Sequence, residues 1–275
     1  MLPAALLLAA TASAGAEPLV FDHGRLFLTA EINGVQTEAL LDSAAEATLV
    51  DPALAAVAKL PQGTPQKIRG SGGEAEARIV EGAVVKALGV ELHPEAIVVL
   101  DLAELSTRLI KRPTRMVLGR ELFDAARLRV DIQHRDVKTV GRDVIPAGKQ
   151  LQLKTEHGVE SMPVLVNGRS AHAEVDLGNG SDVLISRALA KALGLKTTGR
   201  KAGGGIGGQL EREIVTLPRL VVAGRTFRDV PAAIDDQPTA SELNIGTSIL
   251  KDFLITTDFQ QHNIWLARRE PSHGD

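Results

Sequence analysis

The chain has 275 residues, a formal net charge of −3, 44% hydrophobic residues and 24% charged residues, which is the balance of a soluble globular protein. The small net charge argues against broad attraction to nucleic acid or to an anionic membrane. An aromatic content of 3% argues against a platform for stacking nucleic-acid bases. The chain has no cysteine, so disulfides, thiol nucleophiles and cysteine-bound metals are excluded.

Residues 1–16 form an apolar segment rich in Ala and Leu that ends in Ala12-Ser13-Ala14-Gly15-Ala16. Such a segment is typical of a secretory signal peptide with cleavage after Ala14 or Ala16, although the usual basic start is missing. A membrane-anchoring or disordered N-terminus is the alternative, but the run is short for a transmembrane helix. We therefore expect an exported protein, periplasmic or secreted, without stable membrane insertion.

After this segment the sequence repeats itself. Placing each residue beside the one 134 positions later aligns Asn33-Gly34 with Asn167-Gly168 and Asp42 with Asp176. Asn-Gly between strand-like runs is a strong signal for a two-residue β-hairpin. Each aspartate ends an apolar strand, where a carboxylate is costly unless something uses or satisfies it. The repeat therefore predicts two acids at equivalent places, brought together on a two-fold axis.

Further along the chain, the two copies continue with the same elements. Short helices are predicted at 52–60 and 187–193, and glycine-rich turns at 70–73 and 203–208, each turn followed by a segment that can be extended. Later elements align at an offset of 127 instead of 134, so the first copy carries about seven additional residues. We assign them to a helical-looking segment at 103–111.

Together these elements predict an all-β protein with one short helix in each of two homologous lobes related by a pseudo-two-fold axis. Proline, glycine and charges at 141–150 indicate a linker between the lobes. The expected divisions are a signal peptide at 1–16, an N-terminal lobe at 17–140, a linker at 141–150, a C-terminal lobe at 151–268 and a tail at 269–275.

The segment Leu41-Asp42-Ser43-Ala44, followed by Thr48-Leu49-Val50, resembles the active-site segment of retropepsin-like and pepsin-like aspartic proteases, whose signature is Asp-Thr/Ser-Gly-Ala. The later elements Val117-Leu118-Gly119 and Asn244-Ile245-Gly246 resemble the second conserved element of that family. The similarity covers nearly all of residues 18–267, once per lobe. The tripeptide alone is a weak signal, but the ordered and repeated set of elements is a strong one.

The resemblance implies an aspartic endopeptidase with both lobes in one chain. Asp42 and Asp176 would form a catalytic pair that shares one proton and activates water, supported by Ser43, Ala44 and Gly178. The glycine-rich turns would be flaps over an extended peptide or protein substrate, with the flap candidates Gly70, Ser71, Gly72, Gly73, Gly204, Gly205, Ile206 and Gly207. We expect a monomer that uses neither a cofactor nor a metal and binds no nucleic acid.

Two residues depart from the family pattern. Ala44 stands where the family prefers glycine, and Leu177 stands where it has serine or threonine. The hydroxyl at the latter position bonds across the two-fold axis in the family, and leucine cannot replace it. A lost buried hydrogen bond costs roughly 1–3 kcal/mol. The alternative is therefore a catalytically weak or inactive relative that binds peptides in the same cleft.

Other interpretations of the same residues are weaker. Each aspartate alone could be a turn or cap residue of a purely structural β-protein. Gly203-x-Gly205-x-x-Gly208 has the spacing of a dinucleotide-binding motif but lacks a strand before it and a helix after it. His23 and His157 precede glycines in turns, and no His-x-x-x-His spacing indicates a metal site.

Overall fold

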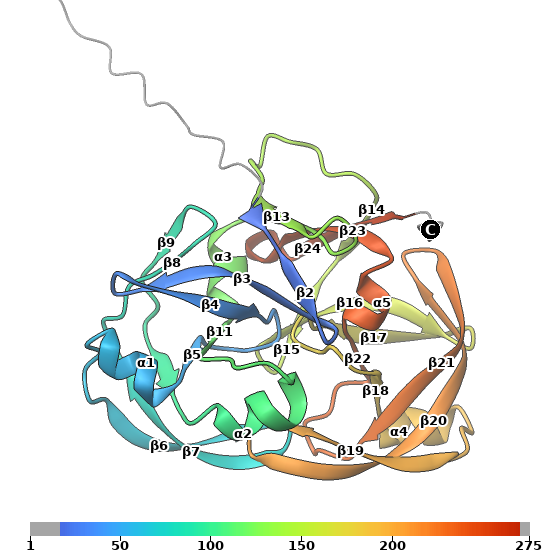
Figure 1. Ribbon diagram of the computed structural model, residues 1–275. Helices are drawn as coiled ribbons and strands as arrows, with labels where there is room; N and C mark the ends of the chain where they lie inside the picture. The colour runs from blue at the N-terminus through green and yellow to red at the C-terminus, as the bar shows by residue number, and fades with distance from the viewer. Residues whose placement is uncertain (1–16, 270–275) are drawn as a thin grey trace, which may run out of the picture.

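The computed structural model describes residues 17–269. The predicted signal peptide at 1–16 lies outside this range, as does nearly all of the predicted tail. The fold is mostly β, with two repeated halves, as the sequence predicts. The strands of the described residues form three sheets, one in each half and one shared between them (Figure 1). Within 17–269, no helix has the length and apolar character needed to cross a membrane.

The first half is built around the hairpin predicted at Asn33-Gly34. Its two turn residues have φ angles of 46° and 83°, the left-handed conformation of a tight hairpin turn. In chain order the elements of this half are β2 (Val20–Asp22), β3 (Arg25–Ile32), β4 (Val35–Leu41), β5 (Leu49–Val50), α1 (Pro52–Val57), β6 (Thr64–Gly70), β7 (Gly73–Val80), β8 (Val85–Ala87), β9 (Val90–Leu92), β10 (Ile97–Val99), α2 (Ala103–Leu105), β11 (Met116–Leu118) and α3 (Glu121–Ala125).

The second half repeats this order. Asn167-Gly168 forms the equivalent turn, with φ angles of 51° and 85°. The elements of this half are β15 (Lys154–Glu156), β16 (Val159–Val166), β17 (Arg169–Val175), β18 (Val183–Ser186), α4 (Arg187–Ala192), β19 (Gly199–Gly205), β20 (Gly208–Val222), β21 (Arg225–Asp235), β22 (Leu243–Ile245) and α5 (Thr247–Leu250).

The third sheet takes strands from both halves, and we call it the shared sheet. Its order is β1 (Glu17–Pro18), β13 (Asp136–Thr139), β12 (Leu128–Asp131), β23 (Phe253–Asp258), β24 (Asn263–Arg268) and β14 (Lys149–Gln152). The halves meet where β12 and β23 pair antiparallel, Val130 opposite Ile255. β14 begins inside the segment expected to be a linker, because Lys149 and Gln150 pair with β24.

Side chains reinforce this junction. The rings of Phe123 and Phe259 stack with centroids 5.2 Å apart, and Phe259 lies in a 3₁₀ turn at Phe259–Gln261 of the second half. A buried ion pair joins Nη2 of Arg127 to Oδ2 of Asp258 at 2.9 Å. A continuous apolar core runs from Leu26 in the first half to Leu266 in the second. The halves are therefore fixed to each other by main-chain pairing, packing and charge.

The additional residues of the first half lie where the repeat places them. Residues 100–115 connect β10 to β11, whereas residues 236–242 connect the equivalent strands β21 and β22. The longer connection contains α2, which continues into a π-helical turn at Ser106–Ile110. Besides the helix expected in each lobe, α3 and α5 form a single turn after the apolar-Gly element of their half.

Candidate active site

Asp42 and Asp176 are placed by the same arrangement of strands in the two halves. Asp42 follows β4, which lies parallel to β11, and its N–H donates to the carbonyl of Leu118 at 3.0 Å. Asp176 follows β17, which lies parallel to β22, and its N–H donates to the carbonyl of Ile245 at 3.0 Å. In each half, the hydrogen bond to the neighbouring parallel strand therefore fixes the position of the aspartate at the end of its own strand.

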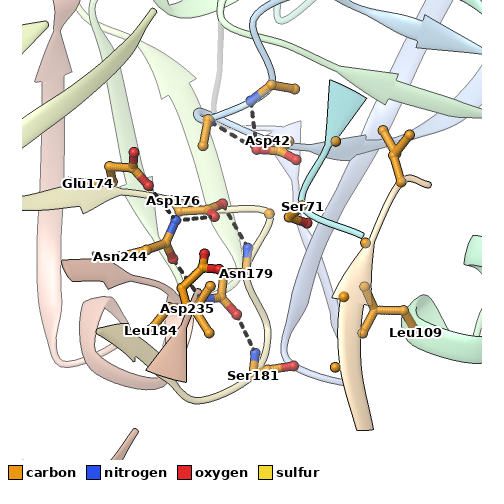
Figure 2. Close-up of a pocket in the computed structure, with 18 of the residues that line it drawn as sticks. Asp42, Ser71, Leu109, Glu174, Asp176, Asn179, Ser181, Leu184, Asp235 and Asn244 are labelled. Carbon is orange, nitrogen blue, oxygen red and sulfur yellow. Dashed lines mark hydrogen bonds between the residues drawn. The ribbon is translucent and has the colours of Figure 1, made fainter. Parts of the chain in front are cut away.

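The two carboxyl groups lie next to each other (Figure 2). Gly178 lies against Asp42, since a Cβ added to this glycine would be 2.3 Å from Cγ of Asp42. Main-chain N–H groups hold the acids in turn. Oδ1 of Asp42 accepts from the N–H of Ala44 at 2.9 Å and of Ala45 at 3.0 Å. Oδ1 of Asp176 accepts from the N–H of Asn179 at 2.9 Å.

Burial shifts the titration of both acids in the same direction. It raises the pKa of Asp176 to about 7, with the charge of Asp42 adding to the effect. Burial also raises the pKa of Asp42, against the opposing effects of the N–H groups of Ala44 and Ala45, the charge of Arg25 and a hydrogen bond with Asp176. Two adjacent, partly desolvated carboxyls resist losing both protons, so the pair keeps one near neutral pH.

Ser43 links the two halves directly beneath the acids. Its hydroxyl donates to the carbonyl of Val175 at 2.6 Å and accepts from the N–H of Leu177 at 3.0 Å. Both partners are main-chain groups, so this half of the link needs no hydroxyl at position 177. Leu177 is fully buried in the core, and its side chain cannot offer the reciprocal bond. Ser43 of the first half is therefore the side chain that makes this link across the two-fold axis, and the second half contributes main-chain groups to it.

Asn244 bridges Asp176 to a second carboxylate, an arrangement that the sequence analysis missed. Its Nδ2 donates to Oδ2 of Asp176 at 2.8 Å and to Oε2 of Glu174 at 3.0 Å (Figure 2). Its Oδ1 accepts from Nδ2 of Asn179 at 2.8 Å, which orients the amide. Comparing the two copies of the repeat could have singled out this position, because the equivalent residue in the first half is the apolar Val117.

The glycine-rich turns form the tips of two hairpins, which we call the first roof hairpin (β6 and β7) and the second roof hairpin (β19 and β20). The tips meet: the N–H of Gly72 donates to the carbonyl of Ile206 at 2.8 Å, and Nη2 of Arg212 donates to the carbonyl of Ser71 at 3.2 Å. A Cβ on Gly207 would lie 2.3 Å from the main chain of Gly73. Such close main-chain contact requires glycine.

A cavity of about 700 Å³ lies between the acids and the roof hairpins. This volume is within the range of roughly 300–1,000 Å³ that is usual for ligand sites. Both halves line it, and five of the eight flap candidates lie at its roof. Gly70, Ser71, Gly204, Gly205 and Ile206 line the cavity. Gly72, Gly73 and Gly207 instead lie against the opposite hairpin.

The additional helical segment of the first half holds the second roof hairpin. Nη2 of Arg108 donates to the carbonyls of Gly205 at 3.0 Å and Gly208 at 3.2 Å, and Nη1 donates to that of Gly203 at 3.4 Å. Glu104 pairs with the same guanidinium. A charged donor on three carbonyls fastens the roof across the boundary between the halves.

Arg108→Ala is expected to speed amide hydrogen exchange in residues 203–210 about tenfold or more, because the lost bonds to a charged group are worth roughly 1.5–3 kcal/mol. Mass spectrometry of peptic fragments after timed exchange measures this. Arg200→Ala, on the same hairpin with its side chain 62% exposed and paired to Glu211, is the control and is expected to exchange as wild type. Equal exchange in both variants would contradict the fastening role.

Comparison with known proteins agrees with this architecture. A family model described as "Aspartyl protease" matches residues 28–122 and again residues 162–259, ranges that include both acids and both roof hairpin tips. The chain therefore belongs to the aspartyl protease family and carries the family's domain in each half. A search of curated proteins found no match.

Proposed function

We propose that this chain is an aspartic endopeptidase in which Asp42 and Asp176 activate a water molecule. The observation that carries the proposal is the meeting of two half-buried carboxyls, from equivalent turns of a duplicated fold, at the floor of a roofed cavity. The raised pKa of Asp176, about 7, supports a pair that holds one proton at working pH. Such a pair can accept and donate protons in the same step.

In this mechanism Asp176 carries the proton and Asp42 is ionised, since the N–H groups of Ala44 and Ala45 stabilise its charge. Asp42 takes a proton from water as the water oxygen bonds to the scissile carbonyl carbon. Asp176 gives its proton to the carbonyl oxygen, which forms a neutral gem-diol. The C–N bond then breaks as Asp42 passes its proton to the amine and Asp176 recovers one from the diol.

The substrate proposed for this cavity is an extended peptide. The roof hairpins present main-chain groups above the acids, and an extended chain bonds to such groups through its own main chain. Admission of a peptide requires the tips to separate, because Gly72 and Ile206 bond to each other in the closed arrangement. The roof hairpins then act as flaps that close over the bound chain and exclude water.

Hydrolysis of a mixed peptide library in H₂¹⁸O tests this proposal. The wild-type protein is expected to cleave internal peptide bonds and to place one ¹⁸O in each new carboxyl terminus. No covalent acyl-enzyme should be trapped, because water attacks directly. Accumulation of a covalent adduct, or neither cleavage nor binding of any peptide, would contradict the proposal.

The second candidate is a peptide-binding relative with weak or no turnover. Leu177 favours it, because the link across the axis comes from Ser43 alone and the acids are held less firmly than by two reciprocal hydroxyls. The same library decides between the candidates. Saturable peptide binding without ¹⁸O incorporation at any pH from acidic to neutral would select the binding module over the peptidase.

A further inference from the structure

The two halves present chemically different walls to the cavity at equivalent positions. In the first half, Leu40 lies opposite Val117 in the sheet, and Val117 lies opposite Leu49. In the second half, the same register places Glu174 opposite Asn244, and Asn244 opposite Leu184. The strand geometry is repeated, so the difference between the walls comes from the side chains alone.

In the first half, a group of apolar side chains forms the wall beside these strands. Its members, which we call the apolar wall, are Leu40, Leu49, Val98, Leu105, Leu109 and Ile110. Five of them belong to a separate hydrophobic cluster beneath the roof and are at most 9% exposed, and Leu109 packs against that cluster. The helical segment at 103–110 supplies three of the six. A substrate side chain that contacts this wall is therefore bound more tightly when it is apolar, because its apolar surface is removed from water.

The second half instead brings a group of polar side chains to the cavity. Its members, which we call the polar wall, are Glu174, Arg212, Asp235, Ser241 and Asn244. Figure 2 shows Glu174, Asn244 and Asp235 on one side of the cavity and Leu109 on the other. Glu174 occupies the position equivalent to Leu40. Ala233 is the counterpart of Val98, and Asp235 follows Ala233 by two residues along β21.

The charges of this wall leave one carboxylate without a cation. Asp235 lies 3.6 Å from Arg212, and Asp182 at the cavity edge pairs with Lys201. The carboxylate of Glu174 accepts from Ser241 Oγ at 2.5 Å and from Asn244, both neutral donors. Among residues 17–269, no salt bridge to Glu174 forms. Arg25 exerts its charge on Asp42 and Asp176.

We infer that the polar wall is a subsite for a basic side chain, lysine or arginine, and that the substrate carries an apolar side chain on the other side of the scissile bond. This inference rests on the peptidase proposal for its chemistry. A cation in the subsite supplies the missing partner of Glu174, with charge-assisted hydrogen bonds in a partly desolvated site. An acidic side chain would instead face Glu174, Asp235 and the catalytic pair.

Arg212 does not reverse this preference. Its side chain is 6% exposed, and its Nε and Nη1 are buried without a hydrogen-bond partner among the described residues. Because these atoms are buried, they do not bond to a ligand in the cavity. The positive charge of the guanidinium only reduces the net negative charge of the polar wall. The accessible acceptors of the subsite are the oxygens of the carboxylates.

Paired peptides with the same flanking sequence test the inference, with Leu-Lys, Lys-Leu, Leu-Leu, Leu-Gln and Leu-Glu at the central positions. One of the two basic peptides is expected to have a kcat/KM about tenfold or more above Leu-Leu, because a hydrogen-bonded charge pair is lost when lysine is replaced. Leu-Glu is expected to be the poorest. Equal cleavage of all five, or preference for Leu-Glu or Leu-Gln, would overturn the inference.

Two substitutions test whether Glu174 causes the preference for a basic side chain. Glu174→Leu introduces the residue found at the equivalent position 40 of the apolar wall. It is expected to invert the ratio of kcat/KM for the basic peptide to kcat/KM for Leu-Leu. Glu174→Gln keeps the shape, and its oxygen can accept from Asn244 while its amide N–H donates to the Ser241 hydroxyl. It therefore serves where the leucine variant does not fold, and it should remove most of the preference. Glu211→Gln, a 65% exposed carboxylate on the same half, is the control and should keep the wild-type ratio.

Binding of non-cleavable peptides separates this inference from the peptidase proposal. Peptides with a reduced amide at the central bond are measured by fluorescence anisotropy. Tighter binding of the basic peptide without cleavage of its normal counterpart would retain the subsite and remove the peptidase. Cleavage of all peptides with equal binding would retain the peptidase and remove the subsite.

Discussion

Asp42→Asn and Asp176→Asn are each expected to lower kcat for peptide hydrolysis about 1,000-fold or more. An asparagine side chain can neither take the proton of the attacking water nor give one to the carbonyl oxygen, and proton transfer of this kind contributes roughly 10²–10⁴-fold to a rate. Neither substitution changes the size of the side chain, so peptide binding is expected to persist. Steady-state kinetics on a single fluorogenic peptide measures both quantities.

The pH profile of the wild-type protein follows from the same pair. Activity is expected to fall as the pH rises through about 7, because the pair then loses the proton that burial retains on Asp176. It is also expected to fall toward acid, where Asp42 becomes protonated at a pKa that burial raises above its ordinary value of 3.8. A rate that keeps rising above pH 8 would contradict this assignment.

Stability provides the control for folding. The raised pKa values mean that the folded state holds protons which the unfolded chain releases near 3.8. The resulting stabilisation is present at acidic pH and is lost as the pH rises through about 7.

Asp176→Asn should therefore unfold at a temperature no lower than wild type above pH 7. Asp51→Asn, which keeps a good cap on α1, should retain full activity.

Gly178→Ala is expected to lower kcat about 100-fold or more. The new methyl group would lie 2.3 Å from Cγ of Asp42, far inside contact distance, so the carboxylate must turn away from its partner. A displacement of about 1 Å at reacting groups can cost about 100-fold in rate. Overpacking of this kind also costs roughly 1–3 kcal/mol of folding free energy. Kinetics and thermal unfolding of the variant measure the two effects.

The duplicated chain supplies a matched control for this substitution. Ala44 occupies the equivalent position of the first half, where the turn already accommodates a methyl group. Ala44→Gly keeps the N–H that donates to Oδ1 of Asp42 and is expected to change kcat less than about fivefold. Similar losses in Gly178→Ala and Ala44→Gly would show that flexibility of the turns, and not contact with Asp42, controls the rate.

Much of the fold could be predicted because its signals are local and occur twice. Asn-Gly sets each hairpin turn, and the cap residue Ser186 begins α4 through the bond of its hydroxyl to the N–H of Leu189. The comparison of copies also located the additional helical segment. Each of these features depends on neighbours along the chain, so one sequence is enough to recognise it.

The features that could not be predicted depend on contacts between distant residues. Nothing near Arg108 in the sequence indicates that it bonds to carbonyls about a hundred residues away. The same holds for Ser43 and the main chain of Val175. The bridging role of Asn244 requires the parallel pairing of β17 with β22, a register that sequence periodicity does not determine. Comparison of Asn244 with Val117 would have identified the position but not its partners.

The two halves belong to one chain, and the shared sheet joins them further through the pairing of β12 of the first half with β23 of the second. A symmetric homodimer must repeat every substitution on both sides of its axis. Fusion removes that constraint, so a leucine at position 40 can coexist with a glutamate at 174. Substitutions can then accumulate in one lobe while the other keeps its role, and a site that two-fold symmetry would make identical on both sides becomes directional.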